Sequence, residues 1–143
     1  MPVSSAQLWK CPRCGRRFAK RNQWHSCRVQ SVDRHFESKP PGLRRLYRTL
    51  VRAMREFGPL RIDAVQSTIN FVSTHHFGGL RVRRAHLRLG FLAERPILNP
   101  RIVRREVVGP RRIAHWVRVS STGDIDRQLL GWLRRAHALQ TRP

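Results

Sequence analysis

Residues 80–91 read LRVRRAHLRLGF, and this stretch decides what kind of fold the chain can adopt. Its apolar residues alternate with arginine or histidine on both sides of a short interruption at Arg84-Ala85. Alternation with a period of two predicts strands that have one apolar and one polar face. The interruption predicts the turn of an antiparallel hairpin.

Similar segments lie on both sides of this stretch. Ile69 and Phe71 flank a polar residue, and residues 103–108 and 113–119 surround a turn signal at Gly109-Pro110. Together these segments predict an antiparallel sheet that is connected by hairpin turns.

Two segments have the longer period of a helix. Residues 43–57 carry one apolar stripe and end at Gly58-Pro59, which is a typical helix stop. The stripe consists of Leu43, Leu46, Tyr47, Leu50, Met54 and Phe57. Residues 124–139 predict a final helix, with Asp124 and Asp126 in its first turn, where the helix dipole favours negative charge. The order of helix, strands and helix predicts an α+β domain in two layers, with an antiparallel sheet flanked by two helices, over residues 42–143.

The three cysteines all lie near the start of the chain, before the predicted α+β domain. Cys11 and Cys14 form a Cys-x-x-Cys turn followed by glycine, and Cys27 comes thirteen residues after Cys14. An odd, clustered set of cysteines indicates metal binding rather than a disulfide framework. Zinc prefers four nitrogen or sulfur ligands, and it can supply the folding free energy that about 30 residues cannot obtain from a core. We therefore expect residues 1–35 to form a module with a structural zinc ion, and residues 36–41 to form a proline-rich linker.

The identity of the fourth zinc ligand stays open. We expect Cys11, Cys14, His25 and Cys27 to bind the ion, because i and i+2 side chains point the same way in an extended segment. If residues 25–27 are helical, His35 becomes the better ligand. Phe18, Trp24 and Cys27 also follow the spacing of a two-strand, one-helix zinc finger, although positions 31–33 hold no ligand.

The charge of the chain points to an anionic partner. Thirty Lys and Arg face eight Asp and Glu, which gives a net charge of +22 at pH 7. Such a surplus favours a polyanion, with nucleic acid of either type first among the candidates. Arginines on the predicted helix, hairpins and finger would contact phosphates, and near an exposed Trp they could hold a single strand. The candidate contacts are Arg16, Arg17, Arg44, Arg48, Arg52, Arg55, Arg81, Arg83, Arg104 and Arg112.

A second reading places a cleft for a protein partner or a small ligand on the sheet, near His115 and Trp116. Taken alone, His115 is expected to be a core histidine, because it shares a strand face with Ile113, Val117 and Val119.

Other classes of function find little support in these residues. The sequence has no glycine-rich phosphate loop, no serine elbow and no usefully paired carboxylates, so we do not expect an enzyme. It has no run of 18 apolar residues and no secretory signal at its start, so we expect a cytoplasmic protein without a membrane span.

Most of the chain resembles domain-of-unknown-function family 5655, found in small bacterial proteins with a zinc-ribbon-like N-terminus. The resemblance rests on residues 9–18, 22–27, 67–71, 87–92, 99–102, 109–115, 124–126 and 132–133. It implies a bacterial source, a zinc site at the Cys/His cluster and an α+β domain, and it implies no activity.

Overall fold

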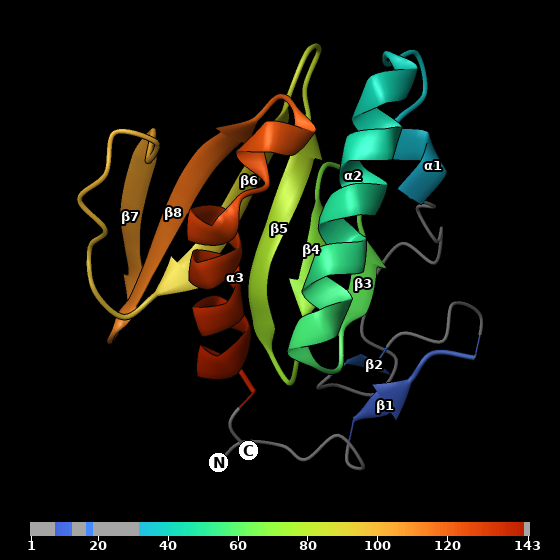
Figure 1. Ribbon diagram of the computed structural model, residues 1–143. Helices are drawn as coiled ribbons and strands as arrows, with labels where there is room; N and C mark the ends of the chain where they lie inside the picture. Colours follow the sequence, from blue (N-terminus) through green and yellow to red (C-terminus); the bar gives the residue numbers. More distant parts are fainter. Residues whose placement is uncertain (1–7, 13–16, 19–31, 142–143) are drawn as a thin grey trace. The chain divides into compact units, whose positions relative to one another are not determined.

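The computed structural model describes residues 8–12, 17–18 and 32–141 (Figure 1). The chain divides into two compact units, Met1–Gln30 and Ser31–Pro143. In the first unit, β1 (Trp9–Lys10) and β2 (Arg17–Phe18) pair in an antiparallel ladder. Cys11 directly follows β1.

The joint between the units lies earlier than the linker predicted at residues 36–41. The second unit begins at Ser31, and α1 (Val32–His35) is its first element. Phe36 is buried, and its ring lies 5.3 Å from the ring of Tyr47. Pro41 opens the next helix, a position where the missing N–H of proline costs no hydrogen bond. The two prolines therefore start a helix of the second unit instead of separating two domains.

The second unit is built on a six-stranded antiparallel sheet in the order β3-β4-β5-β6-β8-β7. The predicted strands and both predicted hairpin turns are confirmed, and a short first strand, β3, was not predicted because its four residues mix charged and apolar side chains. The strands are β3 (Arg61–Ala64), β4 (Ile69–Val72), β5 (His76–Val82), β6 (Leu87–Ala93), β7 (Arg104–Gly109) and β8 (Arg112–Val119).

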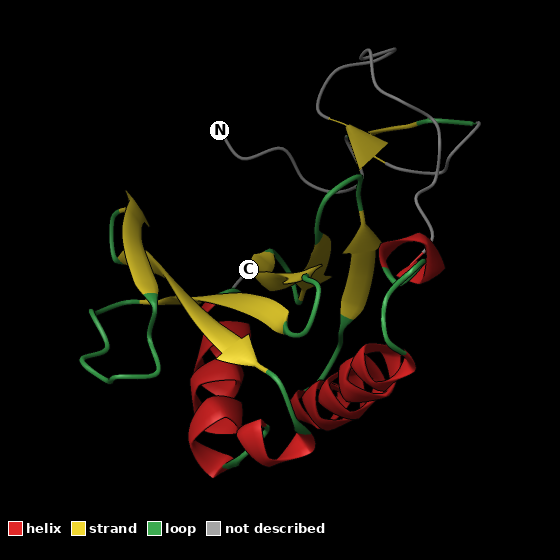
Figure 2. Cartoon of the chain, turned by 90° about the horizontal axis from the view of Figure 1, so that it is seen from above, coloured by secondary structure: helices red, strands yellow, loops and turns green. Residues whose placement is uncertain are grey.

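Both long helices pack on the same face of this sheet (Figure 2). The predicted first helix corresponds to α2 (Pro41–Met54) and a 3-10 turn, η2 (Arg55–Phe57), and the predicted last helix corresponds to α3 (Arg127–Leu139). Within residues 32–141, no helix covers the opposite face of the sheet (Figure 2). The domain is therefore α+β in two layers, as predicted. No helix among the described residues is long and apolar enough to cross a membrane.

The hydrophobic core fills the space between the helices and the covered face of the sheet. The alternating residues Leu87, Leu89 and Phe91 of β6 are all buried there. From α3, Leu129 and Leu133 are fully buried against them. Burial of these side chains supplies the main driving force for the fold, at about 1.5–3 kcal/mol for each large apolar residue.

The start of α3 differs slightly from the prediction. Asp126 is the N-cap rather than a first-turn residue, and its carboxylate accepts the backbone N–H of Leu129 at 3.0 Å. Arg101 donates to the same carboxylate at 2.9 Å. Both interactions favour the charged form and lower the pKa of Asp126. Asp124 instead closes the preceding 3-10 turn, η3 (Thr122–Asp124), through a capping box with Ser121.

His115 is a core histidine, as the strand alternation predicts. The side chain has no solvent exposure and stacks on Phe91 at 5.5 Å. The backbone N–H of Ile97 donates to Nε2 at 3.0 Å, so Nδ1 carries the proton and donates to the Ile113 carbonyl at 2.9 Å. Burial lowers the pKa of His115, and the positive charge of Arg105 adds to this, while the bond to Ile113 opposes it. The neutral ring thereby anchors the segment that leads from β6 to β7.

The packing of α3 predicts the effect of shortening one of its core side chains. Leu133→Ala should lower the free energy of unfolding by about 2–5 kcal/mol, because it removes a fully buried side chain and leaves a cavity. The exposed Arg127 on the same helix provides the control. Arg127→Ala should change the free energy of unfolding by less than about 0.5 kcal/mol. Urea unfolding measures both values. Equal losses would mean that α3 is not held by its buried face.

The burial of His115 predicts how stability depends on pH. The folded pKa lies below the ordinary value of 6.5, so the unfolded chain binds the proton more tightly. Stability should therefore fall as the pH drops below about 6.5, until the folded state is protonated as well. Nitrogen-15 NMR of the imidazole should show that the neutral Nδ1–H form predominates at pH 6.5, the ordinary pKa of histidine. A ring that titrates at or above its ordinary pKa would contradict this arrangement.

Candidate functional site

The register of the sheet aligns one row of residues across its uncovered face. Asn70 lies opposite Gly79, which lies opposite Gly90. Gly90 lies opposite Trp116, which lies opposite Arg104. Directly paired residues in a sheet project to the same face, so the row joins five strands on one surface.

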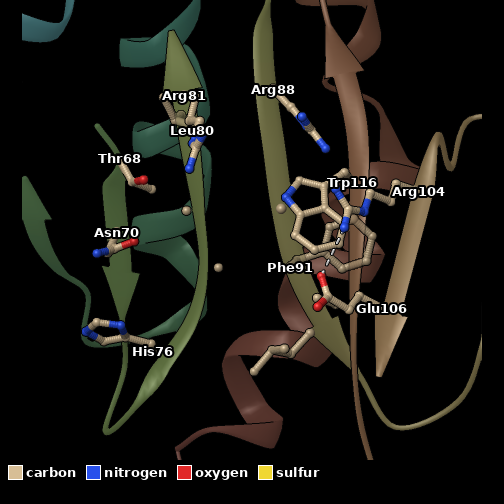
Figure 3. A pocket seen from close by; sticks show the side chains of 15 residues that line it. Thr68, Asn70, His76, Leu80, Arg81, Arg88, Phe91, Arg104, Glu106 and Trp116 are labelled. Carbon is tan, nitrogen blue, oxygen red and sulfur yellow. Dashed lines mark hydrogen bonds and ion pairs between the residues drawn. The ribbon is translucent and has the colours of Figure 1, made fainter. Parts of the chain in front are cut away.

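The two glycines leave a hollow of about 490 Å³ in the middle of this face (Figure 3). A Cβ atom on Gly90 would lie 2.9 Å from Nε1 of Trp116, and one on Gly79 would lie 2.9 Å from Oδ1 of Asn70. Both positions therefore require glycine if these side chains are to stay in place. Asn70 and Thr68 form one wall, and Trp116 with Arg104 forms the other (Figure 3).

Trp116 is an aromatic residue that lines the hollow, and two arginines lie near its ring. The guanidinium carbons of Arg88 and Arg104 lie 5.6 Å and 5.4 Å from the centroid of its ring, within the range of cation–π attraction. Arg104 also approaches Glu106 at 3.4 Å, and both side chains of that pair are more than half exposed. An exposed pair of this kind contributes little stability, so Arg104 can turn to an external anion at small cost.

A second row on the same face consists entirely of arginines. Arg81 lies opposite Arg88, and Arg88 lies opposite Arg118. Like charges directly opposite one another destabilise a sheet, and no acid stands in this row. Nε of Arg88 is buried and has no hydrogen-bond partner within the described part of the chain.

The pKa of the neighbouring His86 is lowered by burial and by nearby positive charge. Desolvation lowers its pKa most, and Arg118, Arg83 and Arg88 lower it further. Burial alone would lower the pKa of His86, and the three arginines add to this shift.

The second reading of the sequence placed a cleft near His115 and Trp116, and the hollow lies on the Trp116 side of that pair. They are consecutive residues of β8, so their side chains leave opposite faces of the sheet. His115 points into the core, and Trp116 lines the open hollow. Any cleft on this face is therefore formed with Trp116 and without His115.

The arginines predicted to contact nucleic acid are spread over several surfaces. Arg81 and Arg104 line the hollow, and Arg83 is exposed in the adjoining hairpin turn. Arg48, Arg52 and Arg55 are exposed on the α2–η2 segment, in the helix layer. Arg17 is exposed in β2, and Arg16 lies outside the described residues.

Arg44 and Arg112, two of the predicted contacts, make hydrogen bonds that tie together separate parts of the fold. Arg44 bonds to Asp33 at 2.8 Å and lies over the ring of Phe36. Arg112 donates to the side chain of Gln140 at 2.8 Å and thereby ties β8 to the end of α3. These two side chains therefore have a structural explanation that periodicity alone could not provide.

The predicted zinc ligands lie mostly outside the described residues. Cys14, His25 and Cys27 all fall in that category, whereas Cys11 is buried in the first unit. The described residues contain no group of three or more His, Cys, Asp and Glu side chains placed to hold a metal. His35 belongs to α1 in the second unit, and its Nε2 is buried without a hydrogen-bond partner among the described residues.

The glycines of the hollow were not recognised from the sequence, nor were Arg88 and Arg118 among the selected contacts. One signal was present, since Gly79 and Gly90 interrupt segments that otherwise alternate as strands. Glycine inside a strand often marks a place where a ligand or another chain approaches closely. The alignment of the two glycines with Trp116 depends on register, which the sequence does not display.

Comparison with known proteins adds a family to this description. Searches of the curated proteins and of the solved structures found no match. DUF5655, described as a domain of unknown function, matches residues 32–140. That range covers the whole sheet with α1, α2 and α3, and it begins after the cysteine cluster. The resemblance noted in the sequence is confirmed for this range, and the chain belongs to the DUF5655 family of domains of unknown function.

Proposed function

We propose that the protein binds nucleic acid through the uncovered face of its sheet. The observation that carries this proposal is the row of Arg81, Arg88 and Arg118 on three adjacent strands. Arginine binds phosphate through charge and through a planar set of N–H donors. An anion in this row would reduce the mutual repulsion of the three side chains, and none of the ion pairs among the described residues involves them.

A polymer suits the site better than a single small anion. Strands in a sheet are about 4.8 Å apart, so the three arginines cover roughly 10 Å, the length of about three stacked nucleotides. Arg104 extends the positive charge along the next row. The net charge of +22 adds a long-range attraction for any polyanion.

The sheet face is a better candidate than the helix layer. The exposed arginines of α2 lie on the solvent side of a helix that buries its apolar stripe against the sheet. The sheet face combines arginines, an indole and a concave floor. We therefore assign Arg48, Arg52 and Arg55 a secondary role in the general attraction of polyanions.

A second candidate function is the binding of a small ligand in the same hollow, or of a protein partner on the same face. The volume of about 490 Å³ falls in the range of small-molecule pockets. Binding that is tight and insensitive to salt would favour this alternative over nucleic acid.

The arginine row predicts how affinity depends on salt. Neutralising about three phosphates should give a log–log slope near −2 for single strands, and Arg118→Gln should reduce its magnitude by about 0.7. Arg118→Gln should also leave the melting temperature unchanged or slightly higher, because it removes a repulsive charge. Fluorescence anisotropy with a labelled oligonucleotide at several salt concentrations measures the slope.

The matched control for this experiment is Arg52→Gln. Arg52 is exposed on α2 and loses the same charge, but it lies in the helix layer. We expect a smaller loss of affinity than for Arg118→Gln. Equal losses would show that net charge, rather than this face, determines binding.

We propose further that the first unit holds a structural zinc ion. The proposal is supported by the buried Cys11 next to the β1–β2 pair and by the Cys-x-x-Cys spacing. Thiolates and imidazole nitrogens are the donors that zinc prefers, and bound zinc would stabilise a unit of this small size. Cys11, Cys14 and Cys27 would supply three ligands, and either His25 or His35 would supply the fourth.

Metal analysis tests this assignment. The purified protein should contain one zinc ion per chain, and Cys14→Ser should lose it. His25→Ala and His35→Ala then form a matched pair, of which only the variant that lacks the true ligand should bind zinc more weakly. Unchanged zinc content in Cys14→Ser would refute the ligand set.

A further inference from the structure

We infer that the hollow beside Trp116 takes one unstacked base of a single strand, while the arginine row holds the adjoining phosphates. This inference rests on the proposed function, and it specifies that the ligand is single-stranded rather than duplex nucleic acid. Three adjacent rows of residues on the uncovered face support it, and they differ in chemistry.

The first row supplies charge. Arg81, Arg88 and Arg118 stand side by side, and Nε of Arg88 has no hydrogen-bond partner within the described residues. These side chains offer N–H donors and positive charge without a competing acid in the row. A sugar–phosphate backbone that follows this row would balance the positive charge and accept hydrogen bonds from the accessible guanidinium N–H groups.

The second row supplies a stacking surface and the space beside it. Trp116 is half-buried and lines the hollow, and the paired Gly79 and Gly90 leave the floor next to it free of side chains (Figure 3). An aromatic side chain stacks on any base, because every base has a π face. The bases of an intact duplex are stacked on one another and do not present that face, so this row selects single strands.

The third row contains an acid and gives the site a direction. Leu92 lies opposite Ala114, which lies opposite Glu106. Glu106 lines the hollow at the side away from the arginine row, where its carboxylate disfavours a phosphate (Figure 3). The backbone of the strand therefore runs along the arginine row, and the base points across Trp116 towards Glu106.

The two arginines near Trp116 support both parts of the site. Arg88 belongs to the first row and lies 5.6 Å from the centroid of the indole, so it links phosphate contact to the stacking position. Arg104 lies 5.4 Å from the same centroid and is paired with Glu106 at 3.4 Å. Guanidinium planes stack on bases as well as on aromatic rings, so either can extend the platform.

The experiment compares a labelled 12-nucleotide single strand with the duplex of the same sequence, using the full-length protein. The wild type should bind the single strand more tightly than the duplex. Trp116→Leu should weaken single-strand binding by about 5- to 100-fold, and Trp116→Phe should retain most of it. The salt slope should stay the same in both variants, because neither changes the arginine row.

A second measurement does not depend on a variant that folds. A strand of abasic nucleotides carries the same phosphates without bases, so it should lose the advantage of the single strand over the duplex.

Gly90→Ala tests the space itself, because the added Cβ would displace the indole and should weaken binding of the natural strand only.

The outcomes separate this inference from the proposed function. If duplex, abasic and natural strands bind equally well, with a salt slope that depends on Arg118 but not on Trp116, the base site is refuted and the anionic interface stands. If none of them shows salt-dependent binding, the proposed function fails and the inference fails with it.

Discussion

Burial of one face of the sheet under α2 and α3 is the constraint on which the other features depend. Strands of the central sheet alternate, so committing Leu87, Leu89 and Phe91 to the core commits Arg88 and Gly90 to the opposite side. A shift of one residue in any strand would exchange the two faces and bury charge. The core thus determines which residues remain available on the uncovered face.

The ion pairs among the described residues are made by arginines outside the row of Arg81, Arg88 and Arg118. Three pairs join the described residues, and they use Arg44, Arg101 and Arg104. Arg101 also donates to the backbone carbonyl of Asp124, so it ties the segment before β7 to the start of α3. The row of Arg81, Arg88 and Arg118 has no such partner role among the described ion pairs, and its repulsion must be tolerated by the packing on the other face. The placement of these three arginines on the sheet, rather than the total charge, therefore supports a specific binding face.

Much of the fold could be predicted because periodicity is local. The apolar stripe of α2, the hairpin that begins at Leu80 and the core position of His115 were all visible within short segments. The segment predicted as a linker lies within the second unit, because Phe36 packs on Tyr47 once the chain has folded back on it. The sequence placed a possible cleft near His115 and Trp116, and the structure puts the hollow beside Trp116 because neighbours along a strand point to opposite faces.

By itself, the sequence determined the alternation of apolar and charged residues, the two helices, the excess of arginine and the clustering of cysteines. Those properties depend on neighbours along the chain. Only the tertiary structure decided that Asn70, Gly79, Gly90, Trp116 and Arg104 form one row. The register of five strands sets that row, and register results from packing against the helices and from turn geometry between distant segments. The candidate site is therefore a property of the assembled sheet, because no single strand contains it.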